Sequence, residues 1–188
     1  YVENPDYQKG SILSLWRARD TLLRDATLVM DADVLFPDAF LSRLIAAPSA
    51  SALLLDRGFT DTGEEVKLYG VGDRVIALGK KFVPERWEVV GEGIGFFKCG
   101  AAHAPEYIRL LEESIEDTGG TNEYEDALHR PLARVPVGGG DVDPARHGVP
   151  DPDRGAVTQG GEPQVHAMSV ANSPTAGQPA GVVSATVR

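Results

Sequence analysis

The segment ATLVMDADVLFP, residues 26–37, decides the fold class. Its apolar run, residues 26–30, is typical of a buried strand, and that strand ends in Asp31 and Asp33, which are separated by one alanine. In open α/β sheets, ligands bind beyond the carboxyl ends of strands. Two carboxylates at such an end offer the oxygen ligands that Mg²⁺ prefers. We therefore predict a Mg²⁺ site at Asp31 and Asp33. The alternative is an exposed turn with Asp38 nearby.

Helical and strand-like patterns alternate on both sides of this segment. Apolar residues at helical spacing predict helices over 11–23, 37–45, 105–115 and 122–132. Three of the helix starts have their own signals, which are Ser11 as an N-cap, Pro37 at the first helical position, and a capping box of Asn122 and Glu125. Short apolar runs predict strands over 52–55, 66–69, 74–78, 87–90, 94–98 and 133–137, the second and third forming a hairpin. The alternation favours an α/β fold, a three-layer α/β/α sandwich with a mostly parallel mixed sheet.

The composition changes after residue 137. Residues 138–188 contain no Leu, Ile, Phe, Tyr, Trp or Lys, while Gly and Pro supply 15 of these 51 positions. Such a segment buries too little apolar surface to offset the entropy of ordering it. We expect one partial domain over 1–137, followed by a disordered or weakly ordered tail over 138–188. A natural linker or a shifted reading frame would each account for that tail.

Charge and cysteine content exclude several classes of protein. The net charge of −10 is a poor match to the phosphate backbone of nucleic acids. No apolar run approaches the length of a membrane span, and no secretory signal opens the chain. The single cysteine, Cys99, cannot form an internal disulfide, and we expect it to be a small core residue. These features favour a cytoplasmic protein. The oligomeric state stays open, a homodimer included.

Three further motifs have both a functional and a structural interpretation. The segment GEGIG, residues 91–95, places glycines at alternate positions around Glu92, for close approach to a ligand or for a bend in a strand. Tyr124 or Glu125 would lie at the rim of a substrate pocket, unless Glu125 only caps a helix. Ser11 and Ser14 at a helix start suit a phosphate or a nucleobase edge, and simple N-capping is the alternative.

Taken in order, the segments ENPDY, KGSILSLWRARD, LVMDADVLF, LLLD, GEGIGFFK and NEYEDAL resemble the phosphocholine-cytidylyltransferase-like branch of the nucleotidyltransferases. The resemblance covers about residues 1–137. It implies a nucleotide-diphospho-sugar transferase (GT-A) fold. It also implies transfer of a CMP group from CTP to a phosphorylated or phosphonylated small alcohol, such as phosphocholine, aminoethylphosphonate or inositol phosphate. Mg²⁺ would be required, and pyrophosphate would be released.

The resemblance also implies roles for individual residues. Asp33 matches the metal-binding aspartate of the family, with Asp31 as its helper. Ser11 and Ser14 match the helix start that follows the base-binding region. Glu92 lies on the acceptor side, and Glu125 matches the acid of the Tyr-Glu-Asp-Ala-Leu segment, so both could receive a cationic headgroup.

Two departures from the family pattern lead to further expectations. The basic glycine-rich loop that grips the triphosphate is absent from these residues, so we expect the 188-residue chain alone to be nearly inactive. The second metal-binding aspartate has no convincing match in residues 138–143. The sequence leaves three alternatives open, which are a GT-A glycosyltransferase, a sugar-1-phosphate nucleotidyltransferase and a non-catalytic remnant.

Overall fold

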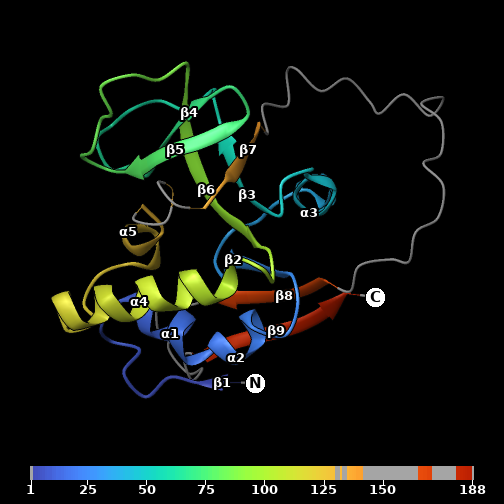
Figure 1. The fold of residues 1–188 in the computed structure, drawn as a ribbon, viewed down its shortest axis with the longest axis vertical. Helices are drawn as coiled ribbons and strands as arrows, with labels where there is room; N and C mark the ends of the chain where they lie inside the picture. The colour runs from blue at the N-terminus through green and yellow to red at the C-terminus, as the bar shows by residue number, and fades with distance from the viewer. Residues whose placement is uncertain (1, 130–131, 133–134, 142–164, 171–180, 188) are drawn as a thin grey trace.

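The computed structural model describes residues 2–129, 132, 135–141, 165–170 and 181–187 as a mixed α/β fold (Figure 1). The helices are α1 (Ser11–Arg17), α2 (Arg19–Leu22), α3 (Asp38–Ala46), α4 (Ala104–Thr118) and α5 (Tyr124–His129). The strands are β1 (Val2–Glu3), β2 (Thr27–Asp31), β3 (Ser51–Asp56), β4 (Lys67–Val71), β5 (Arg74–Gly79), β6 (Val89–Cys99), β7 (Val137–Asp141), β8 (Val165–Val170) and β9 (Gly181–Val187). In the described part of the chain, no helix is long and apolar enough to span a membrane.

The strands form one sheet in the order β1-β9-β8-β2-β6-β3-β7-β5-β4. Among the described strands, two pairings are parallel, β2 with β8 and β3 with β7, and the others are antiparallel. The prediction of a mostly parallel sheet is therefore wrong. The reason is that β6 enters between β2 and β3 in the opposite direction, and that β4 and β5 form a tight hairpin, which requires antiparallel strands.

Five of the strands close into a ring, because β6 pairs with β3 at one end and with β4 at the other. The ring runs β6-β3-β7-β5-β4 and back to β6. A side chain at Gly91 would obstruct this closure, since its Cβ would lie 2.3 Å from Leu55 Cδ1 and 2.8 Å from the carbonyl oxygen of Asp56. The prediction of two strands over 87–90 and 94–98 is also wrong. The cross-strand pairing on both sides keeps β6 continuous through the glycines.

Several predicted helix starts differ by one residue. Gly10, not Ser11, has the extended N-cap backbone before α1, and Pro37 is the N-cap of α3, not its first residue. The first predicted helix is also interrupted at Ala18, which separates α1 from α2. The capping box at α5 is wrong as well. The amide of Asn122 instead donates to Ser114 Oγ at 2.9 Å and accepts from Thr118 Oγ1 at 2.8 Å.

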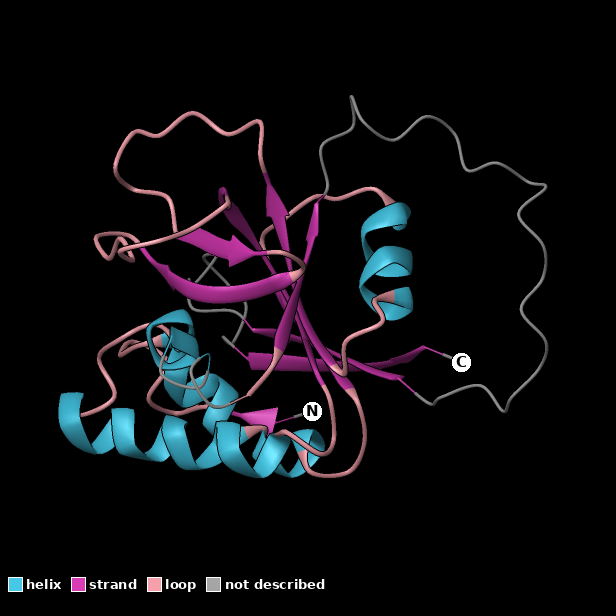
Figure 2. Ribbon diagram, turned by 45° about the horizontal axis from the view of Figure 1, so that its top comes forward, coloured by secondary structure: helices cyan, strands magenta, loops and turns pink. Residues whose placement is uncertain are grey.

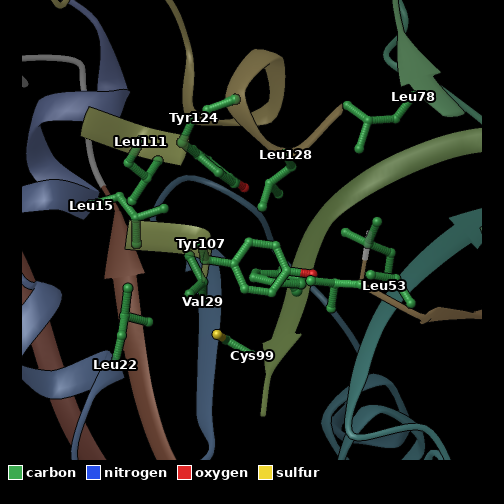
Figure 3. Close-up of a cluster of buried hydrophobic side chains, with 14 of the residues drawn as sticks. Leu15, Leu22, Val29, Leu53, Leu78, Cys99, Tyr107, Leu111, Tyr124 and Leu128 are labelled. Atoms are coloured by element: carbon green, nitrogen blue, oxygen red, sulfur yellow. The ribbon is translucent and has the colours of Figure 1, made fainter. Parts of the chain in front are cut away.

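Apolar side chains pack on both faces of the central strands. On one face, α1, α4 and α5 cover Val29, Leu53 and Phe97 (Figures 1 and 3). On the other face, α3 covers a smaller cluster around Leu54 and Phe96. Figure 2 shows α3 separated by the strands from the remaining helices. The sheet thus buries apolar residues on both sides, which explains why its strands read as continuous apolar runs.

The segment after residue 137 contributes strands as well. The expected boundary between 137 and 138 falls inside β7, which pairs with β3 and β5. Further along, β8 lies beside β2 and β9 lies beside β8. Main-chain pairing does not require large apolar side chains, so composition alone could not reveal these strands. The remainder of the tail, residues 142–164, 171–180 and 188, lies outside the described residues.

Candidate functional site

The end of β2 meets the beginning of α5 at a pair of polar side chains. Asp31 is the last residue of β2, as predicted for this strand end. Tyr124 is the first residue of α5, and its hydroxyl donates a hydrogen bond to Asp31 Oδ1 at 3.1 Å. Burial raises the pKa of Tyr124 well above its ordinary value, so the phenol stays protonated and keeps donating. The contact joins residues 93 positions apart in the sequence.

A small, partly open pocket lies beside this pair. Tyr124 and Glu125 are its polar side chains, and most of the wall is apolar. In Figure 3, the wall residue Leu128 lies next to the Tyr124 side chain, and the wall residues Leu53 and Leu78 lie beyond Leu128. The lining residues are Leu53, Leu54, Val66, Leu68, Leu78, Gly93, Ile94, Gly95, Phe96, Tyr124, Glu125 and Leu128.

Two carboxyl groups in this region are held partly out of water. Burial, and after it the nearby charge of Asp31, raise the pKa of Glu125 to about 7. Burial likewise raises the pKa of Asp31 to about 6, while the Tyr124 hydrogen bond lowers it and the charges of Asp33 and Glu123 raise it. Among the described residues, neither Asp31 nor Glu125 forms an ion pair. The pocket end therefore carries unbalanced negative potential, which favours a cation.

Asp31 and Asp33 are the carboxylates predicted to bind Mg²⁺. Asp33 is exposed just beyond β2, and its charge acts on Asp31. Within the described residues, no group of three or more His, Cys, Asp or Glu side chains is placed to hold a metal ion. Mg²⁺ commonly binds through one or two carboxylates together with substrate phosphates, so two carboxylates are enough for such a shared site.

The structure gives Ser11 and Ser14 contacts inside the protein. Ser11 Oγ accepts from the main-chain N–H of Tyr124 at 3.0 Å, and Ser14 Oγ accepts from Asn4 Nδ2 at 2.9 Å. The two residues are 5% and 1% exposed, so neither hydroxyl is presented to solvent. Both hold structure around α1, and their contact with a nucleotide stays a prediction.

Glu92 lies apart from the acid pair at the pocket. Burial raises its pKa, and the nearby charges are those of Glu65 and Asp56. Lys67 stands opposite Glu92 in the β4–β6 pairing, yet its ammonium binds the carboxylate of Asp61, at 2.9 and 3.0 Å. The structure thus brings Asp31, Tyr124 and Glu125 together, and it does not bring Glu92 to them.

The alternate glycines of residues 91–95 face the chain itself. A Cβ at Gly91 would contact Leu55, and a Cβ at Gly95 would contact Asp31. A Cβ at Gly93 would contact Val66 and Leu68. Their interpretation as a bent strand is therefore correct for the described contacts.

No protein-family model matches the sequence, and no curated protein matches it. Solved structures do match. The inositol-1-phosphate CTP transferase from T. maritima has a TM-score of 0.57 and 17% identity, over 74% of this chain and 54% of that chain. A Bacillus anthracis protein described as a glucose-1-phosphate thymidylyltransferase has a TM-score of 0.54 and 16% identity, over 76% and 56%. A UDP-glucose pyrophosphorylase complexed with UDP-glucose has a TM-score of 0.50 and 11% identity, over 71% and 54%.

The chain shares the fold of these solved nucleotidyltransferases. It spans about half the length of the solved structures that it matches. Within this fold, the pocket and the acid pair lie where the end of β2 meets α5 and β6.

Sequence reasoning missed two features of this site. One is the apolar wall, which is assembled from four strands and α5 and has no local signature. The other is the contact between Gly95 and Asp31, residues 64 positions apart, although the glycine at this position was a visible signal. Long-range packing decides both features, and local periodicity does not report it.

Proposed function

We propose that the protein containing this chain is a Mg²⁺-dependent nucleotidyltransferase. It would transfer a cytidylyl group from CTP to a phosphorylated or phosphonylated small alcohol and release pyrophosphate. The observation that carries the proposal is the unpaired acid group of Asp31 and Glu125 beside the pocket, in a fold shared with solved nucleotidyltransferases. The resemblance of the segments around Asp33 and Glu125 supports the choice of CTP.

The chemistry requires positioning and charge balance more than covalent help. An oxygen of the acceptor phosphate or phosphonate attacks the α-phosphorus in line, and the bond from that phosphorus to the pyrophosphate oxygen breaks. The acceptor oxygen is already ionised near neutral pH, so no general base is needed. Asp33, with Asp31, would hold Mg²⁺, which supplies positive charge against the charge that develops on the α-phosphate. The Tyr124 hydroxyl fixes the rotamer of Asp31 through its hydrogen bond.

The pocket wall favours an acceptor with a compact cationic headgroup. Ten of the twelve lining residues carry apolar side chains or none. Sugar hydroxyls buried against them would lose water without gaining partners, at roughly 1–3 kcal/mol for each unpaired group. An alkylammonium group would place its carbons on the apolar wall and its charge near Glu125 and the Tyr124 ring. Phosphocholine and aminoethylphosphonate fit this pattern better than inositol phosphate.

A sugar 1-phosphate is the second candidate acceptor. Two of the matching structures are described as acting on or holding such sugar compounds, a glucose-1-phosphate thymidylyltransferase and a pyrophosphorylase with bound UDP-glucose. The two candidates share the nucleotidyl transfer step and differ in the acceptor alone. Competition among acceptors therefore separates them.

The test is pyrophosphate release by the protein that carries this chain. It would be assayed with CTP, UTP and TTP against phosphocholine, aminoethylphosphonate, inositol 1-phosphate and glucose 1-phosphate. We expect the highest kcat/KM with CTP and a cationic acceptor. Release with glucose 1-phosphate alone would establish the second candidate. An absence of release with every pair, from folded protein with Mg²⁺, would contradict the nucleotidyltransferase proposal.

The Asp33→Asn variant gives the most direct test of the proposed metal ligand. Loss of this carboxylate should lower kcat by about two to three orders of magnitude, because charge stabilisation by a bound metal contributes several kcal/mol. The fold should change little, since Asp33 is exposed. Asp126→Asn, which removes an exposed acid from α5, is the matched control for net charge. Near wild-type turnover by Asp33→Asn would refute its assignment as a metal ligand.

A further inference from the structure

Strand β6 contains a bulge beside the candidate site. Its pairing with β3 skips from Leu53 opposite Phe97 to Leu55 opposite Gly93, so three residues of β6 stand against one of β3. Gly95 is the middle residue of this insertion, with a φ of +73°. An L-residue reaches this left-handed region at a cost of roughly 1–2 kcal/mol, so the bulge favours glycine on backbone grounds alone.

The space at Gly95 is occupied by the Asp31 side chain. A Cβ at Gly95 would lie 2.1 Å from Asp31 Oδ2, 2.7 Å from its Cγ and 3.1 Å from its Cβ. Distances this short cannot be accommodated without a shift of the carboxylate. The other carboxylate oxygen, Oδ1, accepts the Tyr124 hydrogen bond at 3.1 Å. The Asp31 carboxylate is thus held between the β6 backbone and the Tyr124 hydroxyl.

Three other glycines with positive φ in the described residues differ in this respect, whereas a Cβ at Gly120 would lie 2.7 Å from Leu13 Cδ2, in the core and away from the candidate metal ligands. Gly63, Gly72 and Gly119 have φ values of +92°, +59° and +68°, and a Cβ on any of them would meet nothing within 4 Å. These three serve the conformation of a turn or a helix end. Gly95 combines the same backbone conformation with a contact to a candidate metal ligand and a place in the pocket wall.

We propose that Gly95 is a positioning residue, which reserves the space in which the Asp31 carboxylate is held against Tyr124 at the pocket. The functional part of this proposal rests on the proposed nucleotidyltransferase activity, in which Asp31 assists Asp33. The geometric part rests on the bulge and the distances to Asp31. A methyl group at Gly95 would push the Asp31 carboxylate away from Tyr124.

A double-mutant cycle between Gly95→Ala and Asp31→Ala tests the geometric part in the full chain. Urea unfolding would measure the equilibrium constant of each variant. Gly119→Ala, with nearly the same φ, measures the cost of the backbone conformation, about tenfold in that constant. We expect Gly95→Ala to raise the unfolding equilibrium constant about a hundredfold when Asp31 is present, and about tenfold in the Asp31→Ala background. If Gly95→Ala does not fold alone, recovery of folded protein in the double variant supports the proposal. Equal effects of Gly95→Ala with and without Asp31 would overturn it, as would failure of the double variant to fold if Asp31→Ala alone folds.

Mn²⁺ binding, followed by its electron paramagnetic resonance signal, tests the functional part. Gly95→Ala should weaken Mn²⁺ binding at least tenfold, while Gly119→Ala should leave it unchanged. Equal affinity of wild type and Gly95→Ala would overturn the positioning role. If the wild-type protein binds no Mn²⁺, the proposed metal site fails, and with it the positioning of Asp31 for metal binding, whereas the unfolding cycle still decides the geometric part. The two failures are therefore distinguishable.

Discussion

At the scale of single residues, Glu125 combines a charge with an apolar setting. It lines a pocket whose walls are mostly aliphatic, and burial raises the pKa of its carboxyl to about 7. The folded protein therefore binds this proton more tightly than the unfolded chain, whose carboxyl keeps an ordinary pKa near 4.5. The stability from this group is fully present below about pH 4.5, and it is lost as the pH rises through 7.

Glu125→Gln removes this dependence, because the amide stays neutral. We expect the variant to be more stable than wild type at pH 8, by about 1–3 kcal/mol, and the difference to vanish near pH 4.5. Urea unfolding at several pH values measures it, with Asp126→Asn as the charge control. A constant difference across the pH range would mean that Glu125 is not the titrating group.

The sequence revealed those site residues whose signal is local. Asp31 ends an apolar strand, and Tyr124 with Glu125 begins a helix, so both positions were visible in short patterns. Ser11 has the same kind of pattern, yet its hydroxyl accepts from Tyr124 N–H, 113 residues away. A helix start has the same sequence whether it meets a ligand or another helix, and tertiary packing alone distinguishes the two.

At the scale of elements, the starts of α1 and α5 provide hydrogen-bond acceptors for each other's main-chain N–H groups. Ser11 Oγ accepts from the N–H of Tyr124, and Glu123 Oε2 accepts from the N–H of Ser11 at 3.3 Å. Helix starts leave main-chain donors without partners, and here each helix supplies an acceptor to the other. This reciprocal contact fixes the start of α5, and with it the side chains of Tyr124 and Glu125 at the pocket.

Ser11→Ala should therefore destabilise the protein by about 1–2 kcal/mol, through the unpaired buried N–H of Tyr124. Because Ser11 and Glu123 act on one junction, Ser11→Ala and Glu123→Ala should be non-additive when combined. Urea unfolding measures both effects. Ser42→Ala, an exposed hydroxyl on α3 that donates to its own helix, should change stability by less than about 0.5 kcal/mol. A Ser11→Ala effect no larger than that of Ser42→Ala would contradict the junction.

Element types were more predictable than their partners. Local periodicity and turn residues predict the helices over 105–115 and 37–45, the strand that ends at Asp31 and the hairpin of β4 and β5, and the structure contains all of them. The direction and continuity of β6 do not, because β2, β3 and β4 fix them from distant parts of the chain. The glycines of β6 predict an interruption of the strand, but pairing with β2, β3 and β4 keeps it continuous.

At the scale of the whole molecule, the net charge of −10 and the unpaired acids at the pocket act in the same direction. Both features favour the binding of cations to the folded protein. A divalent ion that binds Asp31 and Asp33 in the folded chain would stabilise it by mass action, by about 1.4 kcal/mol at ten times its dissociation constant. For a chain of this length, that corresponds to about 3–5 °C in Tm.

Thermal unfolding in increasing MgCl₂, with KCl lowered to hold the ionic strength constant, separates specific binding from screening. We expect a saturating rise in Tm for the wild type at pH 8, where Asp31 and Glu125 are both ionised. The Asp31→Asn/Asp33→Asn double variant should show little of this rise, because the ligands are gone while most of the net charge persists. An Asp38→Asn/Asp126→Asn double variant carries the same change in charge at exposed positions of α3 and α5, and should keep the full rise. A rise of equal size in all three proteins would locate the effect in the overall charge, and would leave the end of β2 without a specific Mg²⁺ site.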